Sequence, residues 1–387
     1  MILIQASSTS WSGGPDASLA EIDGKPLVQM TVERCREYFP DHRVIVIAPA
    51  RDATKLNWLD CELHYGHENS VLARMNNAVA FNADRTPVLR INGTNAFFDT
   101  ELAGEMFDQA WHYPLVKVPD DFPTQLCGEA WQAGAIRDLA AQSLSASYLS
   151  RPKFAVQDAY TIKDWTIADS TLNEVRSQMQ RACLPDNIEV TDKAVKSADQ
   201  ITYHYHLANE YLDPKSRVLD IACGEGYGAN LLKQAGHFVC GADLDENKIE
   251  RAALRFAGSM FSKQDIYHLT FPDGLFDAIT CMETIEHLKE PRKALAELHR
   301  VLKPNGKAVL STPQNSHGHI PICPHHEIEY SLEGIKALCA EFFEIERVVG
   351  IKGGTIHFED DPIGTNTVLF MRARKAGDIC QNAKLAA

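Results

Sequence analysis

Residues 216–232 read SRVLDIACGEGYGANLL, and this stretch decides the fold of the second half of the chain. It starts with an apolar run, Val218–Ile221, continues with closely spaced glycines, and takes on a helical pattern near Ala229. Glycine allows a tight turn and a close approach of the backbone to a ligand, and amides at the start of a helix face polar groups. The pattern predicts a strand, a ligand-binding loop and a helix, with the loop glycines at Gly224, Gly226 and Gly228.

A second apolar run strengthens this interpretation. The sequence HFVCGADLDENKIERA at 237–252 predicts a strand that ends in Asp243, about twenty residues after the loop. A carboxylate at that place can accept hydrogen bonds from both hydroxyls of a ribose. The loop and the acid together predict an adenosine-type ligand, either NAD or S-adenosylmethionine (SAM). Apolar runs alternate with helical patterns in both halves, which predicts parallel sheets with crossover helices.

Five segments between about 218 and 348 favour SAM, namely LDIACGEGYG, GADLDENKIERA, KQDIYHLTFPDGLFDAITCMETIEHL, ELHRVLKPNGKAVLSTPQN and HHEIEYSLEGIKAL. They resemble the class I SAM-dependent methyltransferases, most closely the branch related to ubiquinone-biosynthesis O-methyltransferases. The resemblance implies a doubly wound, Rossmann-like α/β domain with SAM across the carboxyl ends of its first strands. It also implies that the cofactor is bound by Asp220, Ala222, Gly224, Gly226, Asp243, Leu244, Asp265, Ile266 and Met282.

An E-x-x-E-H motif at 283–287 follows the strand expected at 276–281. If a helix begins there, Glu283, Glu286 and His287 lie on one face and can share a cation. The ubiquinone-type enzymes bind a divalent ion through this pattern, and the similar small-RNA 2′-O-methyltransferases add a histidine in an H-x-x-E-aromatic context, which His326 matches. The resemblance thus implies that Glu283, Glu286, His287 and His326 are catalytic and bind Mg²⁺ or another divalent cation.

The E-x-x-E-H residues and the histidines before the first strand can each be interpreted in a second way. Glu283 can instead line the cofactor pocket while Glu286 and His287 cap a helix, with no metal. His204 and His206, which precede the first strand, can reach the substrate or lie on a solvated helix face.

The first half contains ILIQASSTS, EIDGKPLVQMTVERC, HRVIVIAPA, GHENSVLARMNNAV and VLRINGTNAFFDTEL. Over about residues 1–102 it resembles the cytidylyltransferases that make CMP-activated sugar acids and related spore-coat polysaccharide proteins, which implies a nucleotidyltransferase-like (GT-A-type), doubly wound domain. That family has a basic loop after the first strand, but residues 5–17 read QASSTSWSGGPDA, and the family's metal-binding Asp is Thr94. Nucleotidyl transfer needs positive charge to stabilise the triphosphate. We therefore expect this domain to be inactive and either to bind a sugar, a nucleotide sugar or a partner, or to serve a structural or dimerising role.

Composition narrows the class of protein. A formal net charge of −14 over 387 residues, without a basic cluster, disfavours nucleic acid as a partner. The ten cysteines form no C-x-x-C pair, and Cys223, Cys240 and Cys281 fall in apolar runs, as expected of a cytoplasmic protein. No stretch reaches the roughly 18 apolar residues of a membrane span, and the first residues do not form a signal peptide, so no membrane association is expected.

These observations divide the chain into a cytidylyltransferase-like domain at 1–182, a polar linker at 183–199, a SAM-dependent methyltransferase domain at 200–376 and a flexible tail at 377–387. The expected function is O-methylation of a sugar or nucleotide-activated sugar in surface-polysaccharide synthesis. There are two alternatives. One is a bifunctional cytidylyltransferase/methyltransferase, and the other is a methyltransferase for a phenolic small molecule with the first domain as a scaffold. A homodimer is left open.

Overall fold

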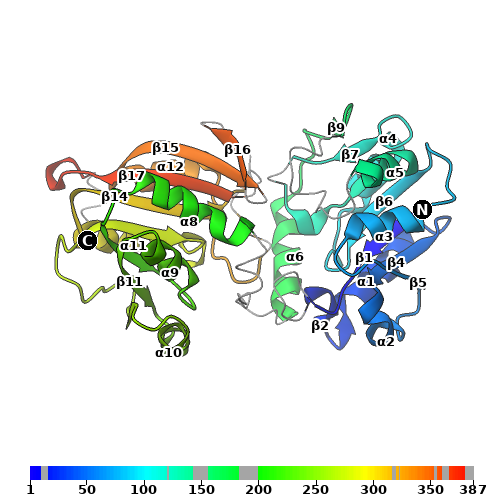
Figure 1. The fold of residues 1–387 in the computed structure, drawn as a ribbon. Helices are drawn as coiled ribbons and strands as arrows, with labels where there is room; N and C mark the ends of the chain where they lie inside the picture. Colours follow the sequence, from blue (N-terminus) through cyan, green and yellow to red (C-terminus); the bar gives the residue numbers. More distant parts are fainter. Residues whose placement is uncertain are drawn as a thin grey trace. The chain divides into compact units, whose positions relative to one another are not determined.

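The computed structural model describes residues 1–9, 16–119, 122–142, 156–182, 199–315, 320–321, 323–352, 355–359 and 366–379. The chain forms two compact units: Met1–Thr191 with Ile322–His325, and Asp192–Pro321 with His326–Ala387 (Figure 1). The predicted linker lies outside the described residues except for Asp199, and the predicted tail is described only to residue 379. The predicted domain boundaries remain predictions.

The first unit has short strands that alternate with helices. Its elements are β1 (Ile2–Gln5), η1 (Ala17–Leu19), β2 (Glu21–Ile22), β3 (Lys25–Pro26), α1 (Leu27–Tyr38), β4 (Val44–Pro49), η2 (Ala50–Asp52), α2 (Ala53–Leu56), β5 (Glu62–Gly66), α3 (Val71–Ala78), β6 (Pro87–Asn92), α4 (Thr100–Gln109), β7 (Leu115–Lys117), η3 (Thr124–Leu126), β8 (Glu129–Gln132), α5 (Ala133–Gln142), β9 (Tyr160–Thr161) and α6 (Asp169–Arg181).

The main sheet of this unit has the order β5-β4-β1-β6-β8-β7-β9. The four strands from β5 to β6 are parallel, and β1, in the middle, is buried almost throughout because its residues are apolar on both faces. Strand β8 is antiparallel to both of its neighbours, β6 and β7. The sheet is therefore mixed, which corrects the expectation of a parallel sheet. A strand as short as β8, with the sequence EAWQ, has no pattern that distinguishes its direction, so the sequence did not reveal this reversal.

The described part of the second unit has a helix from Asp199, followed by alternating strands and helices. Its elements are α8 (Asp199–Tyr211), β10 (Arg217–Ile221), α9 (Tyr227–Gln234), β11 (Phe238–Asp243), α10 (Glu246–Arg255), β12 (Met260–Lys263), β13 (Phe276–Met282), η5 (Ile285–His287), α11 (Pro291–Val301), β14 (Leu302–Pro313), α12 (Leu332–Ala340), β15 (Phe343–Lys352), β16 (Thr355–Glu359), β17 (Asn366–Ala373) and η6 (Ala376–Asp378).

The sheet of the second unit has the order β12-β11-β10-β13-β14-β17-β15-β16. Strands β12 to β14 are parallel, and β17, β15 and β16 are added in antiparallel fashion. This sheet is also mixed rather than wholly parallel. The parallel part places the carboxyl ends of β10, β11, β12 and β13 along one edge, and the residues expected to bind a cofactor follow those ends.

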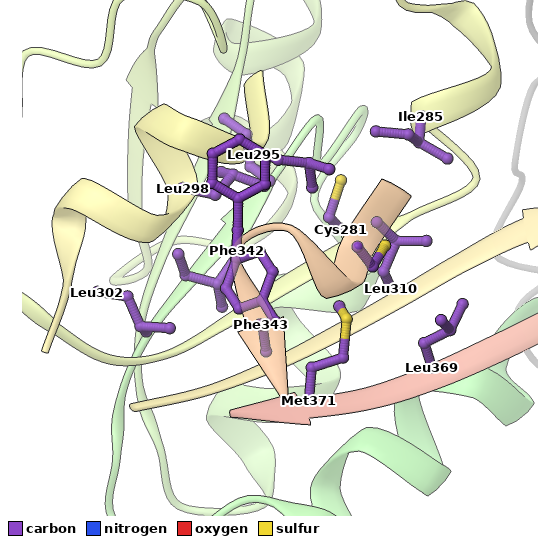
Figure 2. Close-up of a cluster of buried hydrophobic side chains, with 14 of the residues drawn as sticks. Cys281, Ile285, Leu295, Leu298, Leu302, Leu310, Phe342, Phe343, Leu369 and Met371 are labelled. Carbon is purple, nitrogen blue, oxygen red and sulfur yellow. The ribbon is translucent and has the colours of Figure 1, made fainter. Parts of the chain in front are cut away.

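Two apolar cores hold this sheet between helices. One contains side chains of α8 and α9, and the other contains side chains of α11 and α12. Figure 2 shows the second core, in which Leu295 and Leu298 lie close to Phe342, and Cys281 lies near Leu310. Ile285 belongs to this core and is 1% exposed, so it anchors the turn that carries Glu286 and His287. Cys223, Cys240 and Cys281 are buried, as predicted.

The helices of the described part of the chain include none that is both long and apolar enough to cross a membrane.

Candidate functional site

Asp220 lies under the loop that follows β10. Its side chain is fully buried, and its carboxylate accepts hydrogen bonds from Thr280 Oγ1 (2.7 Å) and from the Tyr205 hydroxyl (3.1 Å). Burial raises the pKa of Asp220 to about 7, although both hydrogen bonds act in the opposite direction. These contacts tie the loop to β13 and to α8. Asp220 therefore fixes the end of β10, from which the predicted cofactor-binding loop leaves.

The loop itself adopts left-handed backbone conformations. Ala222, Gly224 and Gly226 have φ values of 56°, 55° and 78°, and α9 begins directly after Gly226. Gly228 is required for a different reason: a Cβ on this residue would lie 1.9 Å from Cζ of Tyr205. Ala222 is the exception in this turn, because a non-glycine residue in this conformation is strained.

Asp243 ends β11 and faces this loop. One carboxylate oxygen accepts the amide of Gly224 (2.9 Å), and the other accepts the amide of Asp245 (3.0 Å). Each oxygen keeps a second lone pair for a ligand hydroxyl. The next residue, Leu244, is 64% exposed, so its side chain is accessible to a ligand. This geometry fits the predicted ribose contact of Asp243 and leaves Leu244 accessible to the cofactor.

The other predicted cofactor residues lie along the same edge. Asp265 follows β12 and accepts the amide of Tyr267 (2.8 Å), while Ile266 packs partly against the core of α11 and α12. Met282 is the last residue of β13, whose Cys281 pairs with Ile221 of β10. The glycine loop and the E-x-x-E-H motif therefore leave neighbouring strands at the same edge. Binding of SAM by these residues remains a prediction.

Glu283 begins the motif with a strained backbone, at φ 46°. Its carboxylate accepts hydrogen bonds from Ser311 Oγ (2.6 Å) and from Asn366 Nδ2. Burial raises the pKa of Glu283, and the hydrogen bonds only partly offset that effect. Two strands, β14 and β17, thus hold this side chain.

The expected helical face is absent here, which corrects the geometry assumed for the motif. Glu286 and His287 lie on the short 3-10 turn η5, and α11 begins only at Pro291, where Glu290 is the N-cap. Because the backbone turns at Glu283, the spacing rules of an α-helix do not apply. The position of this N-cap also removes the alternative in which Glu286 and His287 cap that helix.

The structure nevertheless brings Glu286, His287 and His326 together. One potential ligand atom from each lies within 4.8 Å of the others, and the two imidazole rings pack edge to face with centroids 4.9 Å apart. Glu286 is 1% exposed and accepts a hydrogen bond from Thr312 Oγ1 (3.0 Å). Burial and the neighbouring charge of Glu283 raise the pKa of Glu286. Glu283 is outside this group, so its role as a fourth ligand remains a prediction.

The two histidines before the first strand differ. His204 is 5% exposed, and its Nε2 makes no hydrogen bond among the described residues, so the solvated-face interpretation is wrong for this residue. Burial lowers the pKa of His204 to about 4. His206 is exposed, as that interpretation predicted.

Several residues around the site were not anticipated from the sequence. Thr280 and Ser311 are polar positions within apolar strands, a signal that could have identified them. Tyr205 and Asn366 lie 15 and 83 residues from their partners, so nothing in the local pattern indicated them, whereas Glu329 lies only three residues after its partner His326, within the H-x-x-E-aromatic pattern.

The first unit has a different loop at the corresponding edge. Asp52 is fully buried, and its carboxylate accepts hydrogen bonds from the Ser8 amide (2.8 Å), from Ser7 Oγ (3.1 Å) and from Ser8 Oγ. Burial raises its pKa, but these hydrogen bonds outweigh burial, so the pKa of Asp52 is lowered overall. Thr94 donates to Asn95 Oδ1 (3.2 Å). The Ser8 amide and the hydroxyl donors of Ser7 and Ser8 are therefore already bonded to a carboxylate.

Comparison with known proteins shows that part of the second unit is similar to methyltransferases. Residues 219–310 match a family described as a methyltransferase domain. The chain is 32% identical over 142 residues to a probable S-adenosylmethionine-dependent methyltransferase of Mycolicibacterium smegmatis, covering 35% of this chain and 55% of that protein. It is 41% identical over 103 residues to a demethylmenaquinone methyltransferase of Clavibacter sepedonicus, covering 25% and 42%.

A third relative, a ubiquinone biosynthesis O-methyltransferase of Coxiella burnetii, is 35% identical over 99 residues, covering 24% and 42%. The chain thus spans about half the length of the curated relatives it matches.

Proposed function

We propose that this chain, whose C-terminal unit contains a SAM-dependent methyltransferase domain, methylates a hydroxyl group of a sugar or nucleotide-activated sugar with the help of a divalent cation. The observation that carries the proposal is the grouping of Glu286, His287 and His326 next to the strand that adjoins the glycine loop. A methyl donor and a group able to activate a hydroxyl would then lie at one edge of the sheet.

The chemistry of the residues fits a cation. A buried carboxylate is costly when it has no positive partner, and Glu286 is nearly fully buried beside a second acid. One carboxylate and two imidazoles suit several divalent ions, so the set does not select one. When bound, the cation would lower the pKa of the acceptor hydroxyl.

The protein residues would supply position. Asp243 would hold the ribose, Leu244 would contact the adenine, and Ser311 and Asn366 fix Glu283 at the wall of the site. Orientation of an acceptor oxygen toward a methyl group can contribute roughly 7–11 kcal/mol to the rate. The grouped side chains are therefore proposed to bind and orient the acceptor rather than to form a covalent intermediate.

The sugar acceptor rests on the first unit. Its resemblance to cytidylyltransferases and its sheet order, with parallel β5-β4-β1-β6 followed by antiparallel β8, support a nucleotidyltransferase-like domain. Asp52, which is fully buried and bonded to the loop amide of Ser8, supports loss of catalysis in that domain. We propose that it retains binding of the acceptor or its nucleotide-linked form.

A phenolic acceptor is the second candidate, because the relatives include proteins named for ubiquinone and menaquinone synthesis. Incubation of the full chain with methyl-labelled SAM and parallel panels of nucleotide sugars and phenols would separate the two. Label in a nucleotide sugar alone supports the first proposal, whereas label in a phenol alone favours the second. Release of pyrophosphate from CTP with a sugar acid would instead show a bifunctional enzyme.

Chelation tests the cation. Exhaustive chelation should abolish transfer while SAM binding persists, and an added divalent ion should restore transfer. Glu286→Gln should lose transfer, whereas Glu290→Gln, at an exposed N-cap without a side-chain hydrogen bond, should retain it. Full transfer after chelation would remove the cation from the proposal.

A further inference from the structure

His326 has a carboxylate partner that the proposed function does not use. Its Nδ1 lies 2.7 Å from Oε1 of Glu329, three residues later, and the two side chains are only 15% and 17% exposed. A contact this short between partly buried groups is a charge-assisted hydrogen bond.

Glu329 is itself held in place. Asn315, which is 2% exposed and follows β14, donates from Nδ2 to the other carboxylate oxygen of Glu329 (3.4 Å). The amide of Asn315 donates to the carbonyl of Tyr330 (2.9 Å), which fixes the chain beside Glu329. The carboxylate is thus oriented by a strand end and not by solvent.

The segment between His326 and Glu329 is attached to the turn of the motif. The amides of Glu327 and Ile328 both donate to the carbonyl of Glu286, at 2.7 and 3.2 Å. His326 therefore keeps its place relative to Glu286 through the backbone, while its ring contacts Glu329 and His287.

We propose that Glu329 is a positioning residue that holds His326 in the tautomer protonated at Nδ1, so that Nε2 is the ring nitrogen presented to a cation or an acceptor proton. An ionised carboxylate can only accept a hydrogen bond, so the proton between the two groups belongs to Nδ1. A partner of this kind fixes the ring and raises its basicity as a ligand. The inference rests on the proposed function, because it assigns a use to His326 within that site.

Nitrogen NMR of the full chain with ¹⁵N-labelled histidine tests the proposal, because the ring shifts report the tautomer directly. Wild type should show His326 protonated at Nδ1. Glu329→Ala should populate the Nε2-protonated form, and Glu329→Gln should retain the wild-type form in part, because its amide oxygen still accepts. Glu327→Gln is the matched control, since the Glu327 side chain is 43% exposed and forms an ion pair with Lys289 at 4.0 Å.

Calorimetry with Mn²⁺ alone gives a second readout. Glu329→Ala should weaken Mn²⁺ binding by about 10- to 100-fold, whereas Glu327→Gln should not. A wild-type His326 protonated at Nε2, or an unchanged tautomer in Glu329→Ala, would overturn the proposal. If wild type binds no Mn²⁺, the cation of the proposed function fails, while the NMR result still decides the role of Glu329. If Glu329→Ala does not fold, the role of Glu329 is tested with two other variants. The proposal expects the wild-type ring shifts of His326 to be lost in Glu329→Leu and retained in part in Glu329→Gln.

Discussion

The two units place an aspartate in the same relation to the loop after their first long strand, with different results. In both, the strand pairs in parallel with a second strand, β4 or β11, and an acid at or beyond the end of that second strand accepts a loop amide: Asp52 from Ser8 and Asp243 from Gly224. In the first unit, two serine hydroxyls also donate to the carboxylate, which is completely buried. In the second unit, the loop is made of glycines, and an exposed Leu244 follows the acid.

The difference shows what determines whether such a loop can bind a ligand. Serine side chains supply internal donors that satisfy the acid, whereas glycines supply only amides and leave room. Apart from residues 223–225 themselves, no described atom lies within 4 Å of the place where a Cβ on Gly224 would stand. With the same strand pairing, the loop of the first unit is bonded to Asp52 through its serines, whereas the glycine loop of the second unit leaves space beside Gly224.

The largest expected effect is an opposite dependence of stability on pH. The folded pKa of Asp220 is raised from 3.8 to about 7, so its contribution is present below pH 3.8 and is lost as pH rises through 7. The loss amounts to at most about 4 kcal/mol. Asp52 has a lowered pKa, so its contribution is present above 3.8 and is lost as pH falls. Urea unfolding at pH 5 and pH 8 should show that Asp220→Asn removes the loss at high pH, while an unchanged profile would argue against a protonated Asp220.

Gly228→Ala should destabilise the second unit by about 3 kcal/mol, because the new Cβ would overlap the Tyr205 ring. Gly224→Ala is the matched control in the same loop and should cost only about 1 kcal/mol, from its left-handed backbone. Urea unfolding measures both. Equal losses would mean that the Tyr205 contact does not require glycine.

Asp52→Asn should destabilise the first unit by about 2 kcal/mol, since hydrogen bonds to a buried charge are weakened. SAM affinity should not change, because the proposed SAM site lies in the other unit. Thermal unfolding and SAM titration on the same sample test this separation. A large drop in SAM affinity would contradict it.

The smallest expected effect is a gain. Ala222→Gly should stabilise the second unit by about 0.5–1 kcal/mol, because relief of the positive φ exceeds the added flexibility of glycine in the unfolded chain. A lower unfolding midpoint in urea would indicate that the Ala222 methyl group contributes more through packing than its backbone strain costs.

The sequence predicted the elements that depend on local pattern. Strand β10, the glycine loop and Asp243 occupy the expected places, since residue type alone sets the turn and the apolar run sets the strand. Grouping of Glu286, His287 and His326 was also expected, although an α-helix was the wrong reason for it.

Contacts from distant segments could not be predicted in the same way. Asn366 reaches Glu283 from a strand 83 residues later, because β17 pairs in antiparallel fashion with β14. The burial of His204 depends on how α8 packs on the sheet, and a histidine at this place in the sequence does not indicate which face of the helix will be buried. Register and helix packing decide these contacts, and both arise only when the sheet assembles.

Titration of SAM into the full chain, wild type and Asp243→Ala, by calorimetry tests the central claim most directly. If the edge formed by the glycine loop and Asp243 holds the cofactor, wild type binds SAM, and the variant loses about 1.5–3 kcal/mol of binding free energy, roughly 10- to 150-fold in affinity. Equal affinity in the two proteins, with the variant folded, would contradict the placement of the cofactor at this edge.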